Sequence, residues 1–268
     1  MADAEHGGPK DALCECTWGW NELKPGDNPC FHMPQVHPSL IKHIDRLTGG
    51  REGLRFLLPL CGKSLDMKWL QEKGHTVVGV EFVEKAAQHF FEDHGIEPTV
   101  SEEPSIGGGK HYKGLDGKIS MYICNYFDFN SDVCGQFDAV WDRGSLMAME
   151  VRDQKRYVDL TKSLMKPDAR YMMETFECSK DQGQGQGHGD GHGREPHGHH
   201  HGNEQQSHGH PHDQPHGEGG EDIITGDQIK ALFGDGYEFA CLEDKNSPPN
   251  DFAKQHGYIS LIYFLKPK

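Results

Sequence analysis

Arg55-Phe-Leu-Leu-Pro-Leu60-Cys-Gly-Lys-Ser64 and His75-Thr-Val-Val-Gly-Val-Glu81 are the two stretches that decide the fold of this chain. Each begins as an apolar β-strand. The first strand ends in a turn that contains Gly62, and the second ends in a carboxylate. In a nucleoside-binding βαβ unit, a carboxylate about twenty residues after the turn lies where the ribose binds. The pattern therefore predicts such a unit, with Glu81 at the ribose.

The turn after the first strand has no Gly-x-Gly-x-x-Gly pattern. A dinucleotide pyrophosphate packs against those glycines, so their absence argues against NAD and FAD. It favours a nucleoside ligand without phosphates, and S-adenosylmethionine is the commonest such ligand of this architecture. Gly62 supplies the small residue that a backbone close to a ligand requires.

Strand and helix patterns alternate along the rest of the chain. A helix is expected over Ser39–Leu47, and another from Ser64 to about Lys73, with Leu65 and Trp69 packed on the sheet. A hairpin is expected at 110–113 and 118–123. Further strands are expected at 119–124, 137–141, 169–176, 236–243 and 257–265, and further helices at 83–91, 153–165 and 225–233. This alternation predicts an α/β fold with a Rossmann-like, doubly wound sheet and helices on both faces.

Two segments have compositions that do not support a packed core. Residues 1–16 are polar and Gly-rich and predict a disordered tail. Residues 179–221 are almost wholly Gly, His, Gln, Asp, Glu and Pro, so they predict a disordered insert. Residues 17–268 are expected to form a single domain that contains this insert, and residues 17–50 are expected to form its N-terminal cap.

Composition excludes several classes of partner. The net charge is -15, from 42 acidic and 27 basic side chains, which makes nucleic acid an unsuitable partner. No signal peptide and no membrane span is expected from the sequence. The eight cysteines are scattered without a Cys-x-x-Cys pair, which is typical of reduced thiols. A cytoplasmic monomer that binds small molecules, with no membrane or nucleic-acid partner, is the expectation.

Three blocks give a more specific indication than the architecture does. They are Leu58-Pro-Leu-Cys-Gly-Lys-Ser-Leu-Asp-Met-Lys-Trp69, Gly74-His-Thr-Val-Val-Gly-Val-Glu81 and Phe137-Asp-Ala-Val-Trp-Asp-Arg-Gly144. In this order and spacing they resemble the thiopurine S-methyltransferase family. The resemblance runs from about Trp20 to about Phe176 and resumes weakly from about Gly226. It implies the seven-stranded methyltransferase sheet, S-adenosylmethionine as cofactor, and methyl transfer to the sulfur of small aromatic or heterocyclic thiols.

The resemblance also assigns cofactor-binding residues. These are Trp20, Leu60, Gly62, Glu81, Asn125, Tyr126 and Arg143. The backbone of Asn125 and Tyr126 is the expected contact with adenine. Two alternatives for the Tyr126 ring are that it lies beside the purine or that it belongs to the core. Asp128 could contact the adenine amino group. Cys61 is either a nucleophile or a small apolar wall residue. The second is favoured, because methyl transfer to sulfur needs no covalent intermediate.

On the acceptor side, the resemblance places Arg143 between the cofactor and the substrate sulfur, as the catalytic residue. An alternative is that Arg143 simply pairs with Asp142. Phe31 would offer a flat face to an aromatic thiol. The chain lacks two residues of the family. Lys24 occupies the position of the family's second cap tryptophan. Phe252 falls near the position of the family's substrate-side arginine, and Lys254 is the nearest cation.

Ten of the 19 histidines crowd the insert, including His199, His200 and His201. Imidazoles at this density bind zinc, nickel or copper with low selectivity. The insert keeps open a second function, that of a metal-binding protein on a methyltransferase fold. The first turn keeps open a third, because relatives that methylate small inorganic nucleophiles share it: a methyltransferase that acts on halide, selenium or tellurium species.

Overall fold

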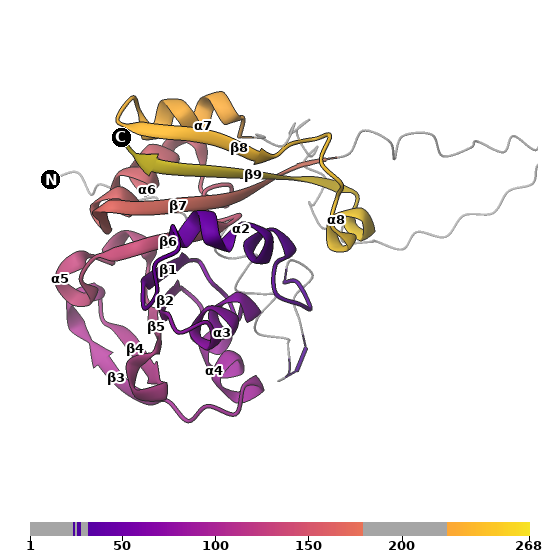
Figure 1. Ribbon diagram of the computed structural model, residues 1–268. Coiled ribbons are helices and arrows are strands. Elements are labelled where there is room, and N and C mark those ends of the chain that lie inside the picture. Colours follow the sequence, from indigo (N-terminus) through magenta and orange to yellow (C-terminus); the bar gives the residue numbers. More distant parts are fainter. Residues whose placement is uncertain (1–23, 25, 28–31, 179–223) are drawn as a thin grey trace, which may run out of the picture. The chain divides into compact units, whose positions relative to one another are not determined.

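Nine strands form one mixed sheet in the order β3-β4-β5-β2-β1-β6-β7-β9-β8 (Figure 1). The structure is a computed structural model, and it describes residues 24, 26–27, 32–178 and 224–268. All of these residues belong to one of the two units into which contacts divide the chain. The predicted tail, Trp20, Phe31 and the predicted insert lie outside the described residues.

The strands are β1 (Arg55–Pro59), β2 (Thr76–Glu81), β3 (Thr99–Glu103), β4 (Gly109–Gly114), β5 (Ile119–Ile123), β6 (Phe137–Arg143), β7 (Met165–Cys178), β8 (Tyr237–Glu243) and β9 (Tyr258–Pro267). The helices are α2 (Pro38–Thr48), α3 (Leu65–Glu72), α4 (Glu84–Asp93), α5 (Ser131–Cys134), α6 (Val151–Ser163), α7 (Gly226–Phe233) and α8 (Asp251–His256). Three short 3-10 helices are η1 (Pro104–Ile106), η2 (Leu115–Gly117) and η3 (Tyr126–Asp128).

The centre of the sheet is parallel and its two ends are antiparallel. Parallel pairs join β5, β2, β1, β6 and β7, while β9 and β8 extend one end and β4 and β3 the other. The doubly wound α/β fold is therefore confirmed, and the expected hairpin is β4–β5. The strand count of seven was wrong, because the sheet also contains the β3–β4 pair. Strand β3 has exposed, mostly polar residues, so no apolar alternation marked it.

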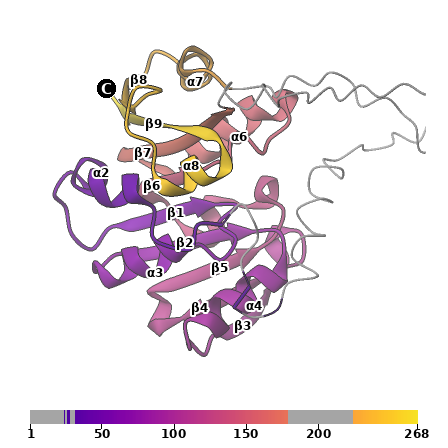
Figure 2. The same ribbon diagram turned by 90° about the vertical axis from the view of Figure 1, so that its right-hand side faces the viewer.

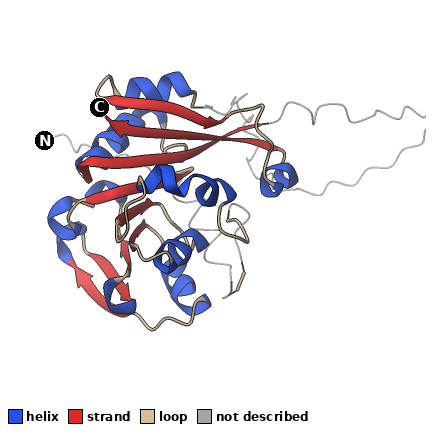
Figure 3. Cartoon of the chain, in the orientation of Figure 1, coloured by secondary structure: helices blue, strands red, loops and turns tan. Residues whose placement is uncertain are grey.

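Helices cover both faces of the sheet (Figures 2 and 3), and the two largest core clusters lie on opposite faces. On one face, side chains of α2, α3 and α4 pack on the sheet, for example Leu40, Met67 and Phe90. On the other face the packing side chains come from α5, α6 and α7, for example Tyr157 and Phe233. This two-sided burial leaves the carboxyl ends of the parallel strands as the edge at which loops can form a site.

The start of α3 agrees with the sequence, but its buried face does not. The Ser64 side chain caps the helix by accepting the Asp66 N–H. The buried residues are Asp66, Met67 and Leu70, whereas the predicted inward pair, Leu65 and Trp69, is half-buried. The helix is turned this way because the Asp66 carboxylate has buried partners: it accepts Trp141 Nε1–H at 2.7 Å and the His37 N–H at 2.8 Å.

Among residues 32–178 and 224–268, no helix combines the length and the apolar character that a bilayer crossing requires.

Candidate active site

A pocket opens where β1 and β6 end, at the carboxyl edge of the parallel strands. The two strand ends are tied together by Ser145, whose hydroxyl donates to the Pro59 carbonyl at 2.8 Å. The lining side chains come from the end of β1 with the turn after it, from the end of β6, and from the segment before α2. They are His32, Leu58, Pro59, Leu60, Cys61, Ser64, Trp141 and Arg143.

The turn between β1 and α3 has a strained backbone. Leu60 has φ 43° and Gly62 has φ 52°, both in the left-handed region. Glycine adopts this conformation freely, but for a leucine it costs about 1–2 kcal/mol. Strain of this kind persists only where the surroundings enforce it, and it clusters at ligand sites. The resemblance assigned both residues to the cofactor, and both lie at the pocket or next to it.

Glu81 ends β2 as a buried carboxylate that joins this turn. Its Oε2 accepts the Gly62 N–H at 2.8 Å, and its Oε1 accepts the N–H groups of Phe82 and Val83 at 2.7 and 2.9 Å. Burial raises the pKa of Glu81, and the three backbone donors oppose the rise. The predicted ribose carboxylate therefore contacts the turn expected to bind the same ligand.

Cys61 lies in this turn as a buried thiol. Burial, with the nearby charge of Glu81, raises the pKa of the Cys61 thiol well above its ordinary value. A thiol attacks as the thiolate, so this environment disfavours a nucleophile. The favoured interpretation of Cys61, an apolar wall residue, fits the pocket lining.

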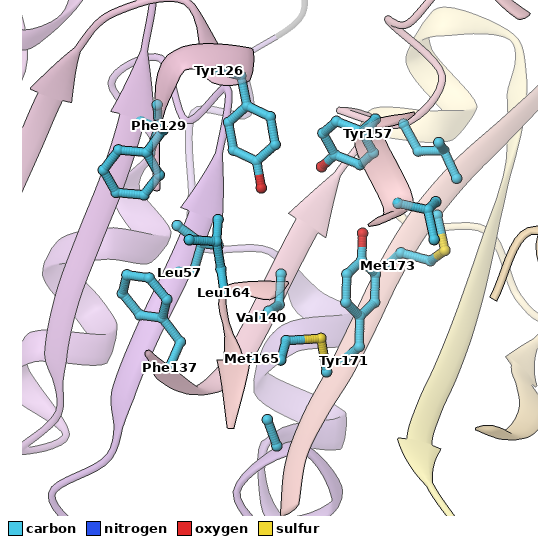
Figure 4. Close-up of a cluster of buried hydrophobic side chains, with 14 of the residues drawn as sticks. Leu57, Tyr126, Phe129, Phe137, Val140, Tyr157, Leu164, Met165, Tyr171 and Met173 are labelled. Carbon is cyan, nitrogen blue, oxygen red and sulfur yellow. The ribbon is translucent and has the colours of Figure 1, made fainter. Parts of the chain in front are cut away.

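After β5, the Asn125 side chain accepts the Phe127 N–H at 3.0 Å and caps η3. The Tyr126 ring lies in the core beside Tyr157 (Figure 4), and its hydroxyl bonds to Thr161 Oγ1 at 2.9 Å. The reading in which this ring stacks on a purine is therefore wrong, because packing holds it inside. The backbone contact of Asn125 and Tyr126 with adenine stays a prediction, as does the exposed Asp128.

The suggested pairing of Arg143 with Asp142 is wrong. Asp142 is fully buried and accepts hydrogen bonds from the hydroxyls of Tyr157 and Tyr171, which point toward one another in Figure 4, and from the Ser145 N–H. Successive residues of a strand point to opposite faces. Asp142 therefore joins the core under α6, whereas Arg143 lies on the same face as Trp141 and reaches the pocket.

Arg143 instead meets Glu174, its register partner on β7. Its Nε lies 3.2 Å from Glu174 Oε2, as an ion pair without hydrogen-bond geometry. The guanidinium also lies 5.9 Å from the centroid of the Phe176 ring, and this ring packs edge-on against Tyr258. Arg143, the cation expected beside the acceptor, therefore contacts the buried carboxylate of Glu174 and lies near the aromatic pair of Phe176 and Tyr258.

Two residues of this region were not predicted. His32 lines the pocket, and burial, followed by the charges of Arg143 and Lys63, lowers its pKa to about 3. Phe82 follows Glu81 directly and is 44% exposed, which is unusual for a phenylalanine. The sequence offered one indication for each residue, which is that it directly follows a predicted site residue: His32 follows Phe31, and Phe82 follows Glu81.

Among the residues that the structure describes, no three His, Cys, Asp or Glu side chains are grouped to hold a metal ion. His199, His200 and His201 lie outside that part of the chain.

Comparison with known proteins gives a family match. The sequence model of "Thiopurine S-methyltransferase (TPMT)" matches residues 17–187. The "Probable thiopurine S-methyltransferase" of Danio rerio is 44% identical over 165 residues, which cover 62% of this chain and 69% of that protein. The "Thiopurine S-methyltransferase" of Bos taurus is 42% identical over 159 residues, or 59% of this chain and 64% of the relative. The chain thus spans about two thirds of the length of these relatives.

Solved structures are similar in fold. One, described as "Conversion of a Disulfide Bond into a Thioacetal Group during Echinomycin Biosynthesis", aligns with a TM-score of 0.52. It covers 94% of this chain and 89% of its own, at 12% identity. At that identity the likeness concerns the fold alone.

Proposed function

The chain belongs to the thiopurine S-methyltransferase family, and from that premise we propose that it transfers a methyl group from S-adenosylmethionine to the sulfur of a small aromatic or heterocyclic thiol. The observation that carries the proposal is the pocket at the ends of β1 and β6. There the strained turn after β1, tied to Glu81, lies beside the cationic side chain of Arg143.

The residues around the pocket fit S-adenosylmethionine. Glu81 offers a desolvated carboxylate for the ribose hydroxyls, and Leu60 and Gly62 offer a backbone that a ligand can approach closely. The exposed ring of Phe82 offers an apolar face beside that carboxylate, suited to adenine together with the backbone of Asn125 and Tyr126. The bound cofactor supplies an electrophilic methyl group on a sulfonium.

The chain's own residues hold the acceptor in line and stabilise its charge. The guanidinium of Arg143 steadies a thiolate by its positive charge, and it does not act as a base. His32 does not serve as the base either, because an imidazole with a pKa of about 3 binds a proton too weakly. Aromatic thiols are acidic enough to arrive as thiolates, so positioning in a desolvated pocket supplies most of the rate. Trp20 and Phe31 are proposed to cover the cofactor and the acceptor.

A radiolabelled methyl-transfer assay with thiophenol tests the proposal, with iodide and selenite as competing acceptors. We expect methylated thiol as the main product. Arg143→Ala should lower turnover at saturating cofactor on the order of 10²-fold, because the charge acts mainly in the transition state. It should change cofactor affinity less. Arg152→Ala is the matched control, because this arginine lies in the first turn of α6 with a 64% exposed side chain.

Methyl transfer to iodide or selenite in preference to thiols would replace the proposed acceptor class. Normal turnover of Arg143→Ala at saturation, together with a collapse of cofactor affinity, would remove Arg143 from the acceptor.

A further inference from the structure

Glu174 is a buried carboxylate in the middle of β7, with a side chain only 1% exposed. A carboxylate so far from water needs partners, because an unpaired buried charge is strongly unfavourable. One partner is Arg143, whose Nε lies 3.2 Å from Oε2. The two residues are neighbours across parallel strands, so the sheet itself keeps the pair in register. Glu174 therefore determines the electrostatic environment of the one pocket residue assigned to the acceptor.

The other oxygen of Glu174 fixes the carboxylate in place. Its Oε1 meets His37 Nε2 at 2.9 Å and accepts the Ser260 hydroxyl. The Ser39 N lies 3.2 Å from His37 Nδ1, so in the neutral ring the proton lies on the nitrogen that faces Glu174, and in the charged ring that nitrogen still donates to Glu174. Burial raises the pKa of Glu174, but His37, Arg143 and Ser260 together hold it below its ordinary value. The carboxylate is thus ionised and anchored by the segment before α2, by β6 and by β9.

The other basic side chains considered for the pocket are paired or neutral. Lys63 pairs with Asp93 at 2.7 Å. His32 is neutral because its pKa lies near 3. At the position of the family's substrate-side arginine the chain has Phe252, and Lys254, the nearest cation in the sequence, pairs with Asp251, with its side chain 58% exposed. Among the described residues that line the pocket, the positive charge is therefore that of Arg143, and Glu174 is the carboxylate that neutralises it.

We propose that Glu174 is a specificity-determining residue which neutralises and orients Arg143, so that the enzyme prefers thiols without a second anionic group. The proposal rests on the proposed function. A thiol that carries a carboxylate must be stripped of water to enter the pocket, and a guanidinium already paired with Glu174 offsets little of that penalty. A thiol whose only charge is on sulfur avoids the penalty of a second anion, and the attraction that Arg143 retains acts on the sulfur alone.

The test compares 4-mercaptobenzoate with 4-mercaptobenzamide, which have the same shape and differ by one charge. The measured quantity is the ratio of their kcat/KM values at saturating S-adenosylmethionine and constant ionic strength. The unmodified protein should favour the amide. Glu174→Gln keeps the shape of residue 174 and removes its charge, so the ratio should shift toward the benzoate by about tenfold, the scale of one partly screened charge at close range. Glu174→Asp keeps the charge and is the matched control, with a ratio close to that of the unmodified protein.

A merely structural role would lower kcat/KM for both thiols by the same factor, and that result would overturn the proposal. If Glu174→Gln does not fold, Arg143→Gln gives the opposite test. It leaves the carboxylate without its guanidinium, so the ratio should shift toward the amide by a similar factor of about ten. An unchanged ratio in that variant would also overturn the proposal. Failure of the unmodified protein to methylate either thiol would instead contradict the proposed function.

Discussion

The Glu81 carboxylate accepts three backbone N–H groups within the protein itself. A carboxylate has about four lone-pair sites, so Oε1 is filled by two amides and Oε2 retains one site beyond the Gly62 N–H. Glu81 therefore shapes the turn after β1 and still has an acceptor for a ribose hydroxyl. We therefore propose that the same residue determines both the conformation of the turn and the affinity for the cofactor.

Glu81→Gln should weaken S-adenosylmethionine binding by about 1.5–3 kcal/mol, the usual scale of a hydrogen bond to a charged group. Calorimetry gives the dissociation constant directly. Glu92→Gln, at an exposed position of α4, is the matched control and should leave binding unchanged. An unaltered dissociation constant in Glu81→Gln would separate Glu81 from the ribose.

Residue positions could be predicted from the sequence only where the local pattern contains them. Gly62 lies in the turn after β1 and Glu81 at the end of β2, as expected, because a strand, a turn and a carboxylate follow one another at a known spacing. Their contacts with a ligand stay predictions. The partner of Arg143 was missed because Glu174 lies 31 positions away, while Asp142 is adjacent. Strand alternation already argues against Asp142, since neighbouring residues face opposite sides of a sheet. A glutamate between Met173 and Thr175 in an apolar strand was the available signal.

At the scale of elements, His37 joins the start of α2 to β7 and α3. Its ring contacts Glu174, its N–H donates to Asp66, and the ring packs 5.2 Å from Trp141. Burial, the largest influence, lowers the pKa of His37, but Glu174 and Asp66 reverse this, so that the pKa is raised overall; Arg143 opposes the rise. The position of α2 is therefore coupled to the charge of one imidazole.

His37→Gln should cost more stability near pH 6 than near pH 9, as measured by urea unfolding. A group whose pKa is raised in the folded state contributes its full stabilisation of the fold at pH values below its unfolded-state pKa, which is 6.5 for histidine. It loses that contribution as the pH rises through its folded-state pKa. Glu174 has a lowered pKa in the folded state, so it stabilises the fold at pH values above its unfolded-state pKa of 4.5. It loses that stabilisation as the pH falls through its folded-state pKa. The pair should therefore stabilise most between these two limits.

In a Glu174→Gln background the same His37 substitution should lose most of its pH dependence. A pH-independent difference between the unmodified protein and His37→Gln would show that the imidazole carries no additional proton in the folded state.

Most elements could be predicted because their patterns are long and periodic. The helices expected at 83–91 and 225–233 are α4 (Glu84–Asp93) and α7 (Gly226–Phe233), and the side chain of Thr225 caps the second. The buried face of α3 could not be derived from its own residues, because Asp66 turns inward only to reach Trp141 and His37. The short helix α8 and strand β3 lack a strong apolar period, so nothing local distinguished them from loops.

At the scale of the whole molecule, the described strands on either side of residues 179–223 pair within one sheet. Strand β7 ends at Cys178, and the described part of the chain continues from Ile224 with the capped helix α7 and the β8–β9 pair at one end of the sheet. Both large core clusters contain described residues from each side of that segment. Domain organisation on this scale stays a proposal, with one methyltransferase domain and an insert.

Deletion of residues 183–217 should leave methyl transfer and the fold intact. Shortening a loop lowers its closure entropy only logarithmically, so the free energy of unfolding should stay constant or rise by about 1 kcal/mol. Urea unfolding and steady-state kinetics measure both effects. The deletion removes ten of the 19 histidines, so zinc or nickel binding, followed by calorimetry, should be lost. A large drop in stability, or metal affinity that survives, would contradict this view.

The two outermost strands of the sheet have a consequence for self-association. Strand β3 carries the carboxylates of Glu102 and Glu103, whereas on β8 the exposed Glu238 pairs with Lys266 at 3.1 Å and Glu243 is buried. A second copy that extended the sheet along β3 would bring carboxylates close to one another, in a chain whose net charge is already -15. Charged edge strands are a common defence against such pairing. We therefore expect the β3 edge to repel a second copy, which disfavours growth of the sheet from that end.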